Sequence, residues 1–293
     1  MIDETAVTTT DLHTEAFAFV QTLAHELSAG SVELPSFPDI ALKVRKALDD
    51  ESVTVARIAR IVSVEAGLAA RITVMANSPA MGYGGKPVTD LQNAVTRIGL
   101  ANVRSAALAF ALGQLRRAVQ FRHIMHDLER LWRQSTKVAA LCRVLALRLR
   151  GQNADLAMLA GLLHNIGSVY ILARASEKAG IHRDKENLDM LLDDWSASIG
   201  RSIAENWGLP DDVVEAIGQQ GDADRTKRGS ADLSDVLCVA VSVAGRHADK
   251  SPLHAQLEPP GVLARLGLDA DSWAAIIAES EADIAELQTA LAG

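Results

Sequence analysis

The stretch from Leu156 to Leu172, LAMLAGLLHNIGSVYIL, decides the fold of this chain. Four of its apolar residues recur at the spacing of one helical face: Leu156, Leu159, Leu163 and Ile166. Small residues lie between them, so neighbouring helices can approach closely. His164 projects from the same crowded surface. The pattern predicts a buried helical segment that carries one histidine among apolar side chains.

The composition favours helices along the whole chain of 293 residues. Hydrophobic residues make up 48% of the sequence, which is ample for a core, and aromatic residues make up only 4%. Alanine and leucine are abundant, and both favour helix over strand. We therefore predict an all-α fold. Cys142 and Cys238 lie in apolar patterns without CxxC spacing, so we interpret them as buried thiols without a metal or redox role.

The N-terminal sequence indicates where the protein works. Residues 1–15 contain acidic side chains and no apolar segment of the kind found in signal peptides. No uninterrupted apolar run reaches the roughly 18 residues expected of a membrane-spanning helix. The sequence therefore predicts a cytoplasmic protein that makes no contact with a membrane.

The net charge of −8 hides a strong asymmetry. Residues 97–150 contain eleven basic and two acidic residues, a charge of +9, while the remaining 18 basic and 35 acidic residues give −17. Such polarity can attract an anionic ligand, nucleic acid or an acidic surface, including the protein's own. A solvated face on several helices is the alternative interpretation. The candidates for binding an anion or a partner are Arg104, Arg133, Lys137, Arg143 and Arg148.

Local signals predict the ends of several helices. Thr89 is expected to cap a helix that Gly99 ends, and a second helix is expected from about residue 101 to 115. The glycine-rich stretch 81–87 is expected to be a loop, because no strand precedes it and no phosphate-binding GK[ST] motif follows it.

Three motifs in order carry a resemblance to a known family. They are LPSFPDIALKV at 34–44, MANSP at 75–79 and LQNAVTRIGLANVRSAAL at 91–108. Together they are similar to the N-terminal half of HDOD domains, a bacterial signalling family. The resemblance implies a two-lobed helical domain over residues 30–245, with lobes at 30–115 and 125–245. A disordered tail at 1–12, a helix at 13–29 and a helical extension at 246–293 complete the predicted organisation.

The second lobe resembles the HD phosphohydrolases, of which HDOD domains are degenerate relatives. The metal-binding segment GLLHDIGK of those enzymes appears here as GLLHNIGS, residues 161–168. Other histidine positions of the enzymes are filled here by glutamine or serine. The last metal-binding aspartate of the enzymes has no clear equivalent in this chain, and Ser242 is the residue we assign to its position. The residues predicted to surround the degenerate pocket are Gln134, His164, Asn165, Ser168, Ser196, Gln219 and Gln220. Gln134 is also expected on a buried helical face.

These departures decide the functional prediction. Metal-dependent hydrolysis needs several converging histidine and aspartate ligands, and only His164 remains. The resemblance therefore implies a non-catalytic regulatory scaffold without a cofactor, whose partners are kinases, response regulators or cyclic-dinucleotide enzymes. The alternative is a sensor that holds a nucleotide or another anion in the vacated pocket or on the basic segment. A metal-dependent phosphodiesterase is less favoured, and nucleic-acid binding is disfavoured because aromatic stacking platforms are scarce.

His164 itself has two interpretations that the sequence leaves open. As a structural residue it shares hydrogen bonds with the amides of Gln134, Asn165 or Gln219 in a polar plug. As a functional residue it lines a pocket for a small polar or anionic signal.

Overall fold

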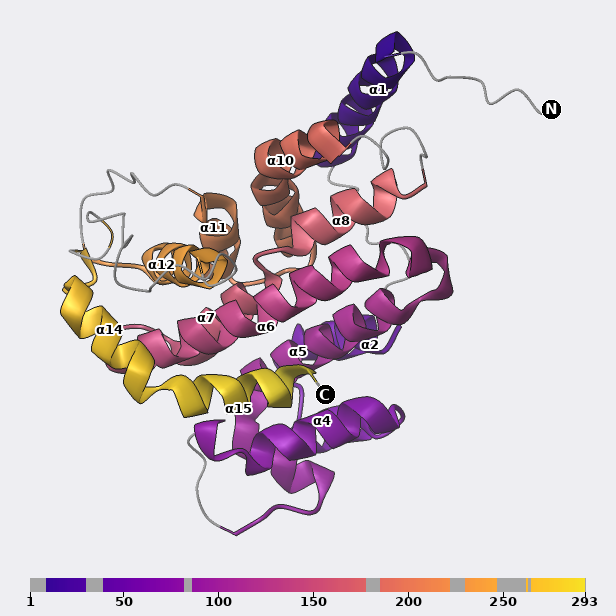
Figure 1. The fold of residues 1–293 in the computed structure, drawn as a ribbon. Helices are drawn as coiled ribbons and strands as arrows, with labels where there is room; N and C mark the ends of the chain where they lie inside the picture. The colour runs from indigo at the N-terminus through magenta and orange to yellow at the C-terminus, as the bar shows by residue number, and fades with distance from the viewer. Residues whose placement is uncertain are drawn as a thin grey trace.

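The computed structural model describes residues 9–29, 39–81, 86–177, 185–221, 230–246, 262 and 265–292. Every regular element among them is a helix, so the all-α prediction is confirmed (Figure 1). Residues 1–8 of the tail expected at 1–12 lie outside the described residues, as do 30–38, 82–85, 178–184, 222–229 and 247–261, whereas residues 9–12 are helical and not a tail. The N-terminal helix α1 spans Thr9–Ser28, so it begins four residues earlier than predicted.

The first lobe is formed by α2, α3, α4, the short 3-10 helix η1 and α5. Their bounds are Asp39–Leu48, Val55–Val62, Ala66–Asn77, Pro79–Met81 and Leu91–Arg117. The Thr54 hydroxyl accepts a hydrogen bond from the Arg57 backbone N–H at 3.2 Å and so caps α3. Asp90 caps α5, not the predicted Thr89, because its carboxylate accepts from the Asn93 backbone N–H at 2.8 Å.

Helix α5 contains a sharp bend at Gly99. This residue has φ 77° and ψ 163°, a backbone conformation that side chains with a Cβ rarely adopt. The sequence predicts two helices separated at this glycine, and the non-helical Gly99 confirms that α5 consists of two helical segments. Helix α5 packs on α4 within the first lobe and also contacts α6 and α7 of the second.

In the second lobe the described residues form the 3-10 helix η2 and six α-helices. They are η2 (Val119–Ile124), α6 (Met125–Arg148), α7 (Ala154–Leu163), α8 (Ile166–Ala175), α10 (Lys185–Asn206), α11 (Asp211–Gln219) and α12 (Leu233–Arg246). Helices α6 and α7 run side by side through the middle of the molecule, and α8 lies against α10 (Figure 1).

Small residues bring these helix pairs into backbone contact. A Cβ added to Gly161 of α7 would lie 2.7 Å from the Ala139 Cα of α6. A Cβ added to Gly167 of α8 would lie 1.9 Å from the Ser196 backbone oxygen of α10. Neither position accepts a larger side chain without moving a backbone. This confirms that the small residues of the quoted stretch serve close helix packing.

Helices at both ends of the chain are docked onto the lobes. At the C-terminal end, α14 (Ala270–Glu279) is followed by α15 (Glu281–Ala292), which packs on α6, α4 and η1. The Ser78 hydroxyl donates to Glu286 Oε1 at 2.6 Å and links α15 to the first lobe. At the other end of the chain, Glu26 of α1 accepts hydrogen bonds from the Tyr170 hydroxyl and the Arg174 guanidinium of α8.

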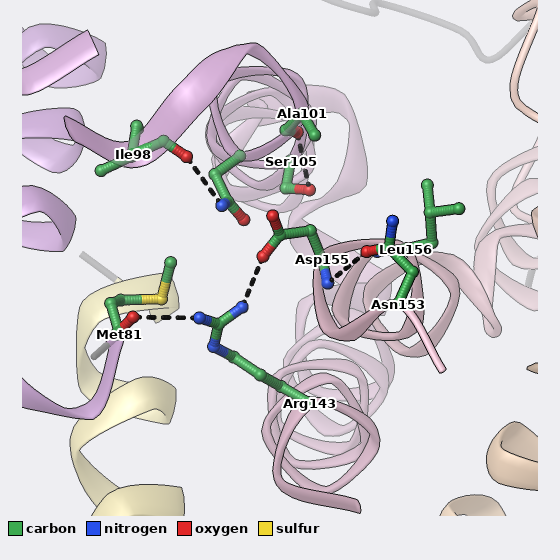
Figure 2. Close-up of polar contacts among 9 residues, drawn as sticks. Met81, Ile98, Ala101, Ser105, Arg143, Asn153, Asp155 and Leu156 are labelled. Atoms are coloured by element: carbon green, nitrogen blue, oxygen red, sulfur yellow. Dashed lines mark hydrogen bonds and ion pairs between the residues drawn. The ribbon is translucent and has the colours of Figure 1, made fainter. Parts of the chain in front are cut away.

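A buried arginine joins α6, α7 and η1 (Figure 2). Arg143 of α6 is 4% exposed, and its Nη1 atom lies 2.6 Å from Asp155 Oδ1 of α7. Its Nη2 atom donates to the Met81 carbonyl at the end of η1, at 3.0 Å. Asn153 positions Asp155, because its side chain accepts from the backbone N–H groups of Asp155 and Leu156 at 3.0 and 3.2 Å. One guanidinium therefore ties the second lobe to the first.

Two stretches are long and apolar enough to span a membrane by length and composition alone, Leu91–Arg117 and Ala154–Ala175. In the structure 67% and 78% of their most apolar windows are buried inside the protein. Their hydrophobicity is accounted for by burial against other helices of the fold.

The contact at Gly161 can be tested by adding one methyl group. Gly161→Ala should lower the free energy of unfolding by about 1–3 kcal/mol, because the backbones of α6 and α7 must separate. Gly113→Ala in α5 is the matched control: its Cβ meets no atom within 4 Å, so it should leave stability unchanged or raise it by up to about 1 kcal/mol. Urea unfolding followed by circular dichroism measures both. Equal effects of the two substitutions would argue against the close contact.

The Arg143–Asp155 pair can be tested by removing one charge. Asp155→Asn should lower the free energy of unfolding by about 2–4 kcal/mol, because it leaves the buried Arg143 guanidinium without a carboxylate. The control is Glu205→Gln, which breaks the half-exposed Arg201–Glu205 pair on α10 and should lower stability by less than about 1 kcal/mol. The denaturant guanidinium chloride is a salt and would screen the charges of both pairs. Urea is therefore the denaturant for this comparison.

Candidate functional site

The candidate site lies at the junction of α7 and α8, where His164 and Asn165 connect the two helices. Gly161 precedes this junction by one turn and Gly167 follows it. Because these two glycines hold α7 against α6 and α8 against α10, the junction has little room to move.

His164 is buried and bonded to its own helix. Its side chain is 1% exposed, and its Nδ1 atom lies 2.7 Å from the Gly161 carbonyl oxygen. A carbonyl only accepts, so Nδ1 carries the proton and Nε2 is left as an acceptor. Nε2 has no hydrogen-bond partner among the described residues. Burial lowers the pKa of His164 to about 4, against a smaller opposing effect of the Gly161 hydrogen bond, so the imidazole is neutral at pH 7.

Two hydrogen bonds join other predicted site residues across helices. The Ser168 hydroxyl of α8 donates to the Ser196 hydroxyl of α10 at 2.9 Å. The Gln220 amide, just after α11, donates to the His164 backbone carbonyl at 2.8 Å. Serine and glutamine side chains thus link the α7–α8 junction to its neighbours.

The remaining predicted residues are placed differently. Gln219 donates to Glu215 at 3.1 Å within α11 and makes no hydrogen bond to His164. Gln134 is partly exposed, although its spacing predicted a buried face. The Asn165 Nδ2 atom is buried and has no acceptor in the described part of the chain. The structure therefore shows no hydrogen bond between the His164 side chain and the amides of Gln134, Asn165 or Gln219. The Gln220 amide binds the backbone carbonyl of His164 instead.

The side chains at this junction do not fit a divalent metal of the HD phosphohydrolase type. Amide and hydroxyl groups, which are weak ligands, stand at the positions of carboxylate and imidazole. The described residues contain no group of three or more histidine, cysteine, aspartate or glutamate side chains that could hold an ion. No chemical step that needs a metal is derived from this site.

Three of the five predicted basic candidates contact other residues of the same chain. Arg143 is removed from the surface by its contacts with Asp155 and Met81, so it no longer qualifies as a site for an external anion. Arg104 donates to the Gly208 carbonyl at 3.3 Å and lies 3.5 Å from Asp49. Arg148 of α6 lies 3.1 Å from Glu279 of α14.

Two basic candidates remain accessible on α6. Arg133 is exposed, and Lys137, four residues later, is partly exposed. Burial of its stem lowers the pKa of the Lys137 ammonium. Because residues four apart lie on the same helical face, these two side chains form one basic surface on α6.

The structure adds a pocket that the sequence did not indicate. It lies between α5, α6 and the α7–α8 junction, and leaves about 20 Å³ for the centres of water molecules. Its polar lining comes from Arg116, Trp132, Ser135 and Asn165, and the rest is leucine, isoleucine and valine. Only Asn165 was predicted as a site residue. Arg116 and Trp132 had no local signal, because they meet through the packing of two separate helices.

A second missed residue is Asp235, which is fully buried near the start of α12. Its carboxylate accepts from the Asp232 backbone N–H and pairs with Arg265 Nη2, both at 2.9 Å. The reciprocal bond from the Asp235 N–H to Asp232 closes a capping arrangement, so its role is structural.

The buried His164 makes stability depend on pH. The unfolded state binds a proton near pH 6.5 and the folded state only near pH 4, so stability rises with pH between these values. Lowering the pH from 7 to 4.5 should remove about 2–3 kcal/mol of stability through this residue. Urea unfolding across this range should show a shallower pH dependence for His164→Gln. The exposed His126→Gln variant should keep the original profile, and an unchanged slope in His164→Gln would contradict the assignment.

Solved structures with the same fold come from several bacteria. A Shewanella amazonensis protein, provisionally named a metal-dependent phosphohydrolase, matches with a TM-score of 0.72 at 23% identity over 95% of this chain and 99% of its own. An HDOD domain protein of unknown function from Geobacter sulfurreducens matches with a TM-score of 0.60 at 24% identity, over 92% and 96%. A Marinobacter aquaeolei protein, provisionally named a signal transduction protein, matches at 0.59 and 20%, over 100% and 69%.

Sequence comparison gives the same family. A relative from Treponema pallidum, itself uncharacterised, is 24% identical over 216 residues, which cover 68% of this chain and 40% of that protein. The chain thus spans less than half the length of this relative. The model of the HDOD domain family matches residues 34–223, well over half of the chain. The chain belongs to the HDOD domain family.

Proposed function

We propose that this chain is a non-catalytic signal-transduction protein of the bacterial cytoplasm. Its HDOD domain acts as a regulatory scaffold that binds other signalling proteins. The observation that supports the proposal is the chemistry of the α7–α8 junction: Ser196 and Gln220, which by resemblance stand at histidine positions of HD hydrolases, are held in hydrogen bonds to Ser168 and to the His164 carbonyl.

The electrostatics of the junction also argue against hydrolysis. A divalent ion needs anionic ligands to offset its charge, and the junction supplies neutral amides, hydroxyls and one neutral imidazole. The provisional name of the Shewanella protein suggests a hydrolase, but at 23% identity the likeness concerns the fold alone. The ligand set of this chain therefore favours the scaffold.

Kinases, response regulators and cyclic-dinucleotide enzymes are the proposed partners. The HDOD membership and the signalling name of the Marinobacter protein support this class. Within the described residues, the basic surface of Arg133 and Lys137 offers a binding face for an acidic partner. The wider basic segment offers less, because Arg104, Arg143 and Arg148 contact acidic side chains of the same chain.

The experiment that tests the proposal has two parts. The first incubates the purified chain with Mn²⁺ and bis(p-nitrophenyl) phosphate and follows release of nitrophenol. We expect no hydrolysis above the metal alone, and none from the single restoration Asn165→Asp, since one added carboxylate does not complete a ligand set. Metal-dependent turnover that His164→Ala abolishes would contradict the non-catalytic assignment.

The second part captures partners of the tagged full chain from its native cytosol by cross-linking and mass spectrometry. We expect one signalling protein in near-stoichiometric amount, lost with the double variant Arg133→Glu, Lys137→Glu. It should be retained with Arg201→Glu, an equally exposed arginine of α10. Recovery of a nucleotide without a protein partner would overturn the scaffold and favour a sensor.

A further inference from the structure

The pocket between α5, α6 and the α7–α8 junction carries an inference beyond the scaffold function. Three of the four polar residues in its lining have a buried N–H group without an acceptor among the described residues. These groups are Arg116 Nε, Trp132 Nε1 and Asn165 Nδ2. Buried donors in folded proteins are almost always bonded, so three such donors around one pocket indicate that an acceptor binds there.

The surroundings of the pocket are positively charged. Arg116 is 12% exposed, its Nη1 atom lies 2.6 Å from Glu129, and its guanidinium stacks over Trp132 at 5.5 Å. These contacts fix the guanidinium while its Nε–H stays unbonded. The pKa of the nearby Arg71 is lowered to about 10, chiefly by burial and further by the charges of Arg117 and Arg116. Three arginines thus gather on this side of the molecule, and Glu129 compensates one of them.

The size and lining of the pocket narrow the chemistry of the ligand. About 20 Å³ for water centres corresponds to roughly one or two water molecules, so a nucleotide does not fit inside. A carboxylate has two acceptor oxygens in a small planar group, and planar groups suit the fork of a guanidinium. The leucine, isoleucine and valine side chains of the wall would contact a short alkyl chain.

We propose that this pocket binds the carboxylate of a ligand that bears a short apolar chain, with Arg116, Trp132 and Asn165 as the donors. All three side chains line the pocket, and a carboxylate inside it would satisfy their unbonded nitrogen atoms. The carboxylate belongs either to a free small acid or to an acidic side chain of a bound protein. The site is separate from the α6 surface of Arg133 and Lys137, and it needs no catalytic activity.

The indole N–H of Trp132 reports binding directly, because a hydrogen bond to an acceptor moves its proton resonance downfield. The experiment titrates ¹⁵N-labelled full-length protein with sodium propionate at constant ionic strength, and Trp132→Phe assigns the resonance among the four tryptophans. We expect a saturable downfield shift of the Trp132 signal. The neutral isostere propionamide should bind about tenfold or more weakly, because it lacks the charge that pairs with Arg116.

Matched variants separate the site from general charge effects. Arg116→Gln should weaken propionate binding about tenfold or more, while Arg201→Gln, which removes an exposed arginine of α10, should leave it unchanged. The other three indole signals show that each variant is folded. A parallel titration with the peptide acetyl-Gly-Glu-Gly-amide distinguishes the sources: tighter binding of the peptide assigns the site to a protein side chain, and tighter binding of propionate to a free acid.

The proposal is overturned if the Trp132 signal does not move, or if propionamide or sodium chloride moves it as much as propionate does. In that case ordered water alone completes the three donors. Unchanged propionate affinity in a folded Arg116→Gln variant would overturn it as well.

Discussion

The position of the candidate site depends on two backbone contacts, one on each side of the α7–α8 junction. Gly161 brings α7 against α6, and Gly167 brings α8 against α10, both too closely for any Cβ. Interiors packed to this density are not continuously deformable. His164 is therefore buried by the geometry of its neighbours, and its neutral state at pH 7 follows from that burial.

The charge asymmetry of the sequence is resolved largely within the molecule. Three arginines of the basic segment contact acidic residues that lie outside it: Arg104 with Asp49, Arg143 with Asp155 and Arg148 with Glu279. Among these arginines only Arg143 is buried, so the other two pairs contribute little to stability. Of the interpretations open from the sequence, attraction to the protein's own acidic surface thus accounts for these three residues. The basic surface that stays accessible to partners is the smaller one formed by Arg133 and Lys137 on α6.

The sequence predicted the features that depend on local patterns. Local signals located the N-terminal helix and the two helical segments on either side of Gly99 to within a few residues, and the ordered motifs identified the HDOD family. Gly99 was predicted as a helix end because a glycine at positive φ interrupts regular helical geometry. The exposure of Gln134 and the meeting of Arg116 with Trp132 depend on how α5 and α6 approach each other, which no short stretch encodes. The Ser168–Ser196 contact was expected only through the family resemblance.

The docking of α15 has a consequence for how the protein is made. Its contact with the first lobe joins Ser78 to Glu286 across 208 positions of the chain, and Leu287 and Leu291 of α15 are buried in the assembled fold. At a synthesis rate of about 5–20 residues per second, the partner of Ser78 leaves the ribosome about 10–40 s after it. During that interval the first lobe displays the uncovered surface on which α15 will rest. The first lobe therefore buries this surface only after the C-terminal helix has been made, whatever the order in which its own helices pack.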